Sequence, residues 1–123
     1  MANPNIVNVT SIYGNTSYLI PSTTAATTWT ALTPAAGTVN KIDNIVAANV
    51  TASVAIVTVA INSAAAGAGT NYRLVYQVPV PVNASVVVVD KSTAFYLGEA
   101  QSIVVTVNTG SAIELTSSYE AIT

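Results

Sequence analysis

The chain has 123 residues, of which 51% are hydrophobic and only 7% are charged, and its formal net charge is −2. It contains no His and no Cys, so the usual catalytic base, thiolate nucleophile and soft metal ligands are missing. Three basic residues are too few to neutralise a run of phosphates, which argues against a nucleic-acid partner. We therefore expect a single non-enzymatic domain that acts by packing or interaction, without cofactor or metal.

The composition predicts an all-β fold. Val, Ile and Thr supply 46 of the 123 residues, and these β-branched side chains suit a pleated, half-buried surface. Eight to nine short strands alternate with turn signals at near-regular spacing, and no segment of helical length competes with them. This pattern is typical of an antiparallel β-sandwich of jelly-roll or immunoglobulin-like type.

Residues 1–13 are predicted to form an N-terminal arm or a first strand, ahead of a single β-sandwich domain over residues 14–123. From Pro4 to Tyr13 the chain has no charge and has apolar side chains on both faces, and Gly14 and Asn15 then predict a turn. A terminal strand with one free face would leave such a pattern exposed, so we expect the arm to contact another chain. The predicted interface residues are Ile6, Val7, Val9, Ile12 and Tyr13.

The middle of the chain predicts strands of increasing length. Short strands are expected at Ser17–Ile20 and Trp29–Leu32, followed by longer ones at Val39–Val50 and Ser53–Ile61. In the predicted strand Ser53–Ile61, the apolar side chains move from one face of the strand to the other after Ile56. Such a change of phase indicates either a bulge or a strand buried on both faces.

In the C-terminal half, residues 72–78 alternate clearly, and Pro79 and Pro81 then indicate an edge strand or a corner. The run Val86–Val89 is apolar on both faces and predicts a central strand. Three further strands are expected at 94–97, 102–107 and 113–120.

No membrane segment is predicted. Residues 44–72 carry no charge, but Ser, Thr and Asn interrupt them and no cluster of Lys or Arg flanks them. A buried hairpin of β-branched residues explains this stretch better than a membrane helix. The start of the chain has no basic region followed by an apolar run, so we expect no signal peptide.

The few acidic side chains form no recognisable catalytic or metal-binding pattern. Glu114 and Glu120 are six residues apart on one predicted strand, or about 20 Å, which is too far to flank one glycosidic bond. Asp90 and Glu99 could approach each other across a turn, but we interpret them as surface acids. Asp43 has no neighbouring acid of the kind that a calcium loop requires.

Aromatic side chains suggest an alternative function as a carbohydrate-binding module. Exposed aromatic rings stack on sugars, although packing in a core or an interface is the favoured interpretation here. The candidates are Trp29, Tyr13, Tyr18, Tyr72, Tyr76 and Tyr96.

Three segments of the chain resemble a family of small virion structural proteins from tailed phages of cyanobacteria and other aquatic bacteria. The opening, from Pro4 to Gly14 (PNIVNVTSIYG), looks like the start of these proteins. Residues 96–103 (YLGEAQSI) are similar to their strand-turn-strand element, but depart from it at Gly98, Ala100 and Gln101. The ending, residues 117–122 (SSYEAI), resembles their usual close.

This resemblance implies a structural protein of the virion, assembled in the host cytoplasm. We expect a capsid decoration (cement) protein that stabilises the head by contact with the major capsid protein or another virion protein. A neck, tail or fibre-associated protein is the alternative.

Because the charge content is far below the roughly 25% of ordinary soluble domains, we also expect a homo-oligomer. Cement proteins commonly occupy local three-fold axes, which makes a trimer the first expectation. No individual site residue carries over from the family.

Overall fold

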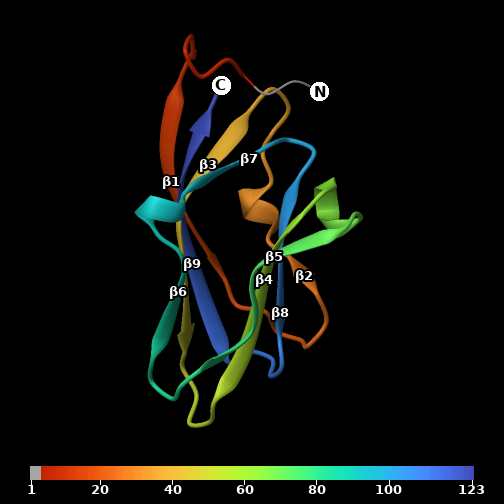
Figure 1. Cartoon of the computed structure of the whole chain (residues 1–123), viewed down its shortest axis with the longest axis vertical. Helices are drawn as coiled ribbons and strands as arrows, with labels where there is room; N and C mark the ends of the chain where they lie inside the picture. Colours follow the sequence, from red (N-terminus) through yellow and green to blue (C-terminus); the bar gives the residue numbers. More distant parts are fainter. Residues whose placement is uncertain (1–3) are drawn as a thin grey trace.

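A computed structural model of the chain describes residues 4–123 and confirms the all-β prediction. Nine strands form two antiparallel sheets that pack face to face as a sandwich (Figure 1). Three single-turn 3-10 helices lie in the connections: η1 (Thr30–Leu32), η2 (Ala65–Gly67) and η3 (Lys91–Thr93). None of these helices is long or apolar enough to cross a membrane.

The first sheet, here called sheet A, contains the first and the last strand of the chain. Its strand order is β1 (Ile12–Leu19), β9 (Ile113–Ile122), β3 (Val39–Asn49) and β6 (Ser85–Val89), and β7 (Phe95–Leu97) also pairs with β3. All of these pairings are antiparallel. The first strand of the chain is therefore an edge strand that pairs with the last.

The second sheet, sheet B, has the order β2 (Thr27–Thr28), β8 (Ser102–Val107), β4 (Ala55–Asn62) and β5 (Asn71–Val80). The pairing of β4 with β5 shifts register on both sides of Val59. The extra residues lie on β5, whereas β4 keeps an unbroken register with β8, so the change of phase predicted after Ile56 is not a bulge in that strand. Ala55, Val57 and Val59 are all buried, and the buried face of β4 changes only at Ala60. Pro79 lies within β5 and Pro81 directly follows it, and β5 is the last strand of its sheet, which confirms the edge strand predicted from these prolines.

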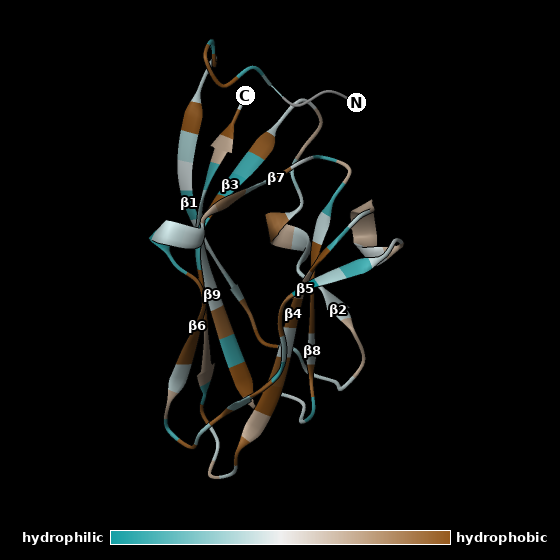
Figure 2. Ribbon diagram, viewed as in Figure 1, coloured by the Kyte–Doolittle hydropathy of each residue, from teal (hydrophilic) through white to brown (hydrophobic). Residues whose placement is uncertain are grey.

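The core lies between the two sheets, where the inward-facing residues of both contribute apolar side chains. The strands of both sheets carry hydrophobic residues, which are brown in Figure 2. The alternation on β9 is clear: Ile113, Leu115 and Ser117 are buried, whereas Glu114 and Thr116 are exposed. The largest side chain of the core is Trp29, which is 1% exposed. The largest of the other fully buried side chains are Leu32, Ile42, Ile45, Leu97, Ile103, Ile113 and Leu115.

Two strand predictions were wrong in the N-terminal quarter. Gly14 and Asn15 do not form a turn, because β1 continues through them in unbroken register with β9. Residues 29–32 do not form a strand, because Trp29 and Leu32 are both buried. Residues three apart point to opposite faces of a strand, whereas the 3-10 turn at η1 directs both into the core.

The valine run at 86–89 was also misassigned, since β6 is an edge strand and not a central one. Val86, Val88 and Val89 pack against or within the core, but Val87 points outward and is 57% exposed. The apolar residues on both faces of β6 therefore do not make it a central strand, because only one of its faces is covered.

Candidate interaction surface

The predicted interface residues divide into two groups in the structure. Ile12 and Tyr13 begin β1, whereas Ile6, Val7 and Val9 precede it in a segment of turns and bends. Four of the five are exposed, and Val7 is the most open at 91%; Val9 is half-buried. Residues 1–3 of the predicted arm lie outside the described residues.

The segment before β1 is anchored to the other end of the chain. The Thr10 and Ser11 amides donate to the Thr123 carbonyl at 2.6 and 3.2 Å, and the Thr123 amide donates back to the Ser11 carbonyl at 3.0 Å. The hydroxyls of Ser11 and Thr123 are also 2.8 Å apart. The described part of the predicted arm therefore ends against the last residue of the chain, beside the end of β9.

Two further exposed residues were missed as interface candidates: Tyr18 on β1 and Ile20, which directly follows the strand. They were not included because Gly14 and Asn15 were read as the end of the first strand. We call the exposed large apolar side chains of residues 4–20 the β1 surface. It consists of Ile6, Val7, Ile12, Tyr13, Tyr18 and Ile20. The first charged residue of the chain is Lys41, so no charge within this segment interrupts the surface.

The aromatic candidates for sugar binding are dispersed. Trp29 is buried in the core, where its Nε1 donates to the Ser17 hydroxyl at 3.0 Å, so it offers no face to a ligand. Tyr72 and Tyr76 are exposed on β5, and the Arg73 guanidinium lies 5.4 Å from the centre of the Tyr76 ring. The remaining exposed tyrosines lie on β1 and β7.

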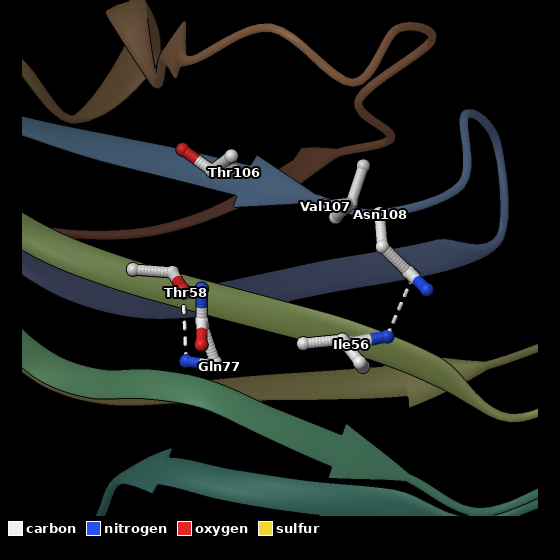
Figure 3. Close-up of a pocket in the computed structure, with 6 residues that line it drawn as sticks. All are labelled: Ile56, Thr58, Gln77, Thr106, Val107 and Asn108. Carbon is white, nitrogen blue, oxygen red and sulfur yellow. Dashed lines mark hydrogen bonds between the residues drawn. The ribbon is translucent and has the colours of Figure 1, made fainter.

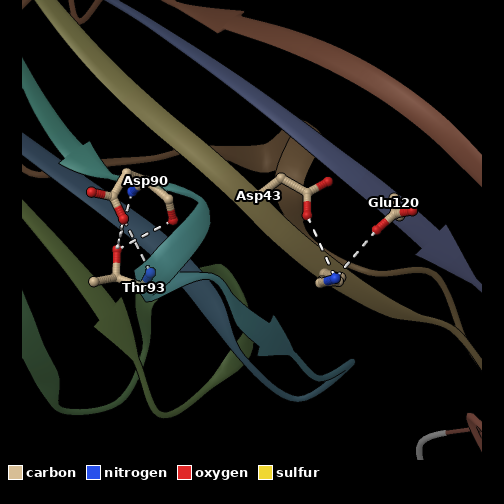
Figure 4. A network of polar contacts seen from close by, with 5 residues as sticks. Asp43, Asp90, Thr93 and Glu120 are labelled. Carbon is tan, nitrogen blue, oxygen red and sulfur yellow. Dashed lines mark hydrogen bonds and ion pairs between the residues drawn. The ribbon is translucent and has the colours of Figure 1, made fainter.

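Several charged side chains have separate local partners (Figure 4). Lys41 Nζ lies 3.9 Å from Asp43 and 3.8 Å from Glu120, and all three side chains are partly exposed, so the ion pairs contribute little. The buried Glu99 carboxylate accepts from the Gly37 amide at 2.7 Å. The interpretation of Glu99 as a surface acid was therefore wrong, because the Gly37 amide holds its carboxylate in a buried position. Asp90 is exposed, as predicted, and caps a different turn.

Asp90 begins η3 with a capping box. Its carboxylate accepts from the Ser92 hydroxyl at 2.6 Å and from the Ser92 and Thr93 amides at 2.9 and 3.1 Å, while its own amide donates to the Thr93 hydroxyl. These hydrogen bonds, led by that from the Ser92 hydroxyl, hold the pKa of Asp90 below its ordinary value. The cluster stabilises a turn.

A shallow pocket of about 120 Å³ opens on sheet B beside the β4–β5 bulge (Figure 3). It is lined by Ile56, Thr58, Gln77, Thr106, Val107 and Asn108. The main-chain amide of Gln77 donates to Thr58 Oγ1, and that of Ile56 donates to Asn108 Oδ1. Both of these side-chain oxygens in the pocket therefore already have a hydrogen-bond partner. It contains no ionisable side chain and is smaller than the roughly 300 Å³ at which ligand pockets begin. Over residues 4–123, no three acidic side chains are grouped to hold a metal ion.

The geometry thus defines a β-sandwich whose first described segment and first strand carry the exposed apolar side chains of the β1 surface. No known family model matches the chain, and no curated protein is significantly similar to it.

Proposed function

We propose that the chain is a non-enzymatic structural protein of a tailed-phage virion, and that it decorates the capsid. In this role it contacts the major capsid protein or another virion protein through the β1 surface. The proposal combines two independent supports: the three segments that resemble virion proteins, and an uncharged apolar surface on an otherwise well-satisfied domain.

The observation that carries the assembly role is the exposure of the β1 surface. Ile6, Val7, Ile12 and Tyr13 are each more than half exposed, although their burial in an interface would be favourable. Large apolar side chains that stay exposed together on one uncharged segment favour a protein–protein contact. Because Thr10 and Ser11 are already bonded to Thr123, docking needs no rearrangement of the domain.

A neck, tail or fibre-associated position is the second candidate, since the same surface would serve there. Copy number in purified particles separates the two positions. A decoration protein is present in numbers comparable to the major capsid protein, whereas a neck or tail component is far rarer. A carbohydrate-binding module receives less support, because the strongest aromatic candidate, Trp29, is buried.

The test is the rebinding of purified protein to particles that lack it. Val7→Asp places a charge on the β1 surface, and Val54→Asp places the same charge on a loop residue that is also exposed, at 54%. We expect both variants to fold, only Val7→Asp to lose particle binding, and electron microscopy of particles carrying the wild-type protein to show it on the head. If no particle fraction contains the protein, the virion proposal is wrong.

A further inference from the structure

The four sheet edges of the sandwich differ in how they are protected from pairing with another chain. β2 has two residues, and the edge of sheet A opposite β1 is divided between β6 with five residues and β7 with three, so all three strands are too short to recruit a long strand. β5 is long, but it carries the charged Arg73, the proline Pro79 and a bulge at which Gln77 has a φ of +50°. Short edges, charges, prolines and bulges are the devices that prevent edge-to-edge association.

β1 has none of these devices. It is eight residues long, contains no charge and no proline, and keeps an unbroken register with β9 from Ile12 opposite Ile122 to Leu19 opposite Leu115. Its other side has no strand partner among the described residues. β1 is therefore the one edge in this part of the chain that is built to accept a further strand.

The hydrogen bonds at the start of the ladder fix which groups of β1 are free. Ser11 and Thr123 exchange two main-chain bonds, so they form a hydrogen-bonded pair. In an antiparallel ladder such pairs alternate with non-bonded pairs, so bonding to β9 continues at the odd-numbered residues of β1. The N–H and C=O groups of the even-numbered residues point away from β9. These residues are Ile12, Gly14, Thr16 and Tyr18.

We infer that this edge pairs with β1 of a second copy, antiparallel and about a two-fold axis through Asn15. In this register Ile12 is opposite the partner's Tyr18, and Gly14 is opposite the partner's Thr16. All eight free groups, one N–H and one C=O from each of four residues, are then hydrogen-bonded. A shift by two residues in either direction leaves at least one of these four residues without a bonded partner.

The side chains agree with this register. Ile12 and Tyr18 are 53% and 73% exposed on the outer face of sheet A, and the pairing brings each against the other in the second copy. Aromatic and β-branched side chains form favourable cross-strand pairs. Asn15 meets Asn15 of the partner subunit in a non-bonded pair, where side chains approach most closely and two amides can bond to each other.

A second copy fits this edge better than an unrelated chain for two reasons. The main-chain donors and acceptors of β1 are self-complementary about Asn15, and no charge on β1 repels an identical strand. The result would be a continuous sheet running from β6 of one copy to β6 of the other. An isologous contact of this type closes at two copies, which replaces the three-fold expectation from the sequence.

The first test uses purified full-length protein and sedimentation equilibrium over a range of concentrations. We expect a reversible dimer, at twice the monomer mass of 12.5 kDa. Asn15→Asp and Asn15→Lys each place like charges on the axis and should weaken the dimer at least tenfold. Mixing the two variants should restore a one-to-one heterodimer. Thr109→Asp and Thr109→Lys, on an exposed turn, are the matched controls and should dimerise normally.

The second test uses the absence of cysteine from the chain. Asn15→Cys places one thiol on the proposed axis, where the facing Cβ atoms of a non-bonded pair are close enough for a disulfide. Mild oxidation should therefore cross-link Asn15→Cys rapidly, and Thr109→Cys slowly. Thr16→Pro removes one outward N–H without loss of a bond to β9, and it should yield a folded monomer.

A wild-type monomer at all concentrations, a trimer, or a dimer that tolerates Asn15→Asp and does not cross-link through Asn15→Cys would each overturn the inference. These outcomes are independent of the virion proposal, which depends on the presence of the protein in particles.

Discussion

Ser17 and Ser117 lie opposite each other on β1 and β9, but only one of the two hydroxyls has a hydrogen-bond partner. Ser17 Oγ accepts from Trp29 Nε1 at 3.0 Å, whereas Ser117 Oγ is buried without a partner among the described residues. Two identical side chains on the same ladder therefore contribute to stability with opposite sign.

The first prediction compares alanine at these two positions. Ser17→Ala leaves the buried indole N–H of Trp29 unpaired and should lower the free energy of unfolding by about 1–3 kcal/mol. Ser117→Ala removes an unsatisfied hydroxyl and should be neutral or stabilising. Urea denaturation, followed by the fluorescence of the single tryptophan, measures both. Equal losses in the two variants would contradict the assigned roles.

The second prediction concerns Asn62, whose buried amide organises the loop that follows β4. Its Nδ2 donates to Gly69 O and Asn71 Oδ1 at 3.2 and 2.7 Å, and its Oδ1 accepts from the Ala64 and Gly69 amides at 3.0 and 2.8 Å. Asn62→Asp removes two donors and buries a charge, so it should cost at least about 2 kcal/mol. Asn71→Asp keeps its accepting oxygen and should cost less. Thermal melts of the two variants provide the comparison.

The third prediction is a pH dependence that arises from Asp90. Its pKa is lower in the folded chain than in the unfolded chain, so its contribution to stability is present above the unfolded value of about 4. That contribution is lost as the pH falls through the lower folded value. Asp90→Asn keeps a capping side chain without the charge, so wild type and variant should converge in stability in acid.

Ser92→Ala should raise the pKa of the Asp90 carboxyl in an NMR titration. A pKa that is unchanged in Ser92→Ala would contradict the role of that hydroxyl.

The fourth prediction compares two glycines. A methyl group at Gly110 would collide with the backbone carbonyl of Ser22, because the β8–β9 turn packs closely against the chain that follows β1. Gly110→Ala should therefore destabilise the fold by about 1–3 kcal/mol. A methyl group at Gly14 meets nothing within 4 Å, so Gly14→Ala should be neutral or slightly stabilising. Equal melting temperatures for the two variants would show that the β8–β9 turn relaxes freely.

The composition was sufficient to predict the sandwich, because strand-forming residues and turn signals act locally. Local signals failed where long-range packing decides the structure. The local sequence around Trp29 and Leu32 predicts a strand, but the core buries both side chains, and a 3-10 turn forms instead. Gly14 and its neighbour predict a turn from local sequence, but pairing with β9 keeps this part of the chain extended. The β1 surface was only partly predicted, because Tyr18 becomes an edge residue only when the last strand of the chain pairs beside the first.

That pairing has a consequence for synthesis of the chain. Ile12 pairs with Ile122, so β1 can join its sheet only after almost the whole chain has left the ribosome. Translation is slow compared with local folding, and strand pairs distant in sequence form late. Throughout that interval an uncharged, apolar strand remains exposed on the nascent chain. The order in which the strands are made, and not only the finished fold, therefore places β1 at risk of aggregation.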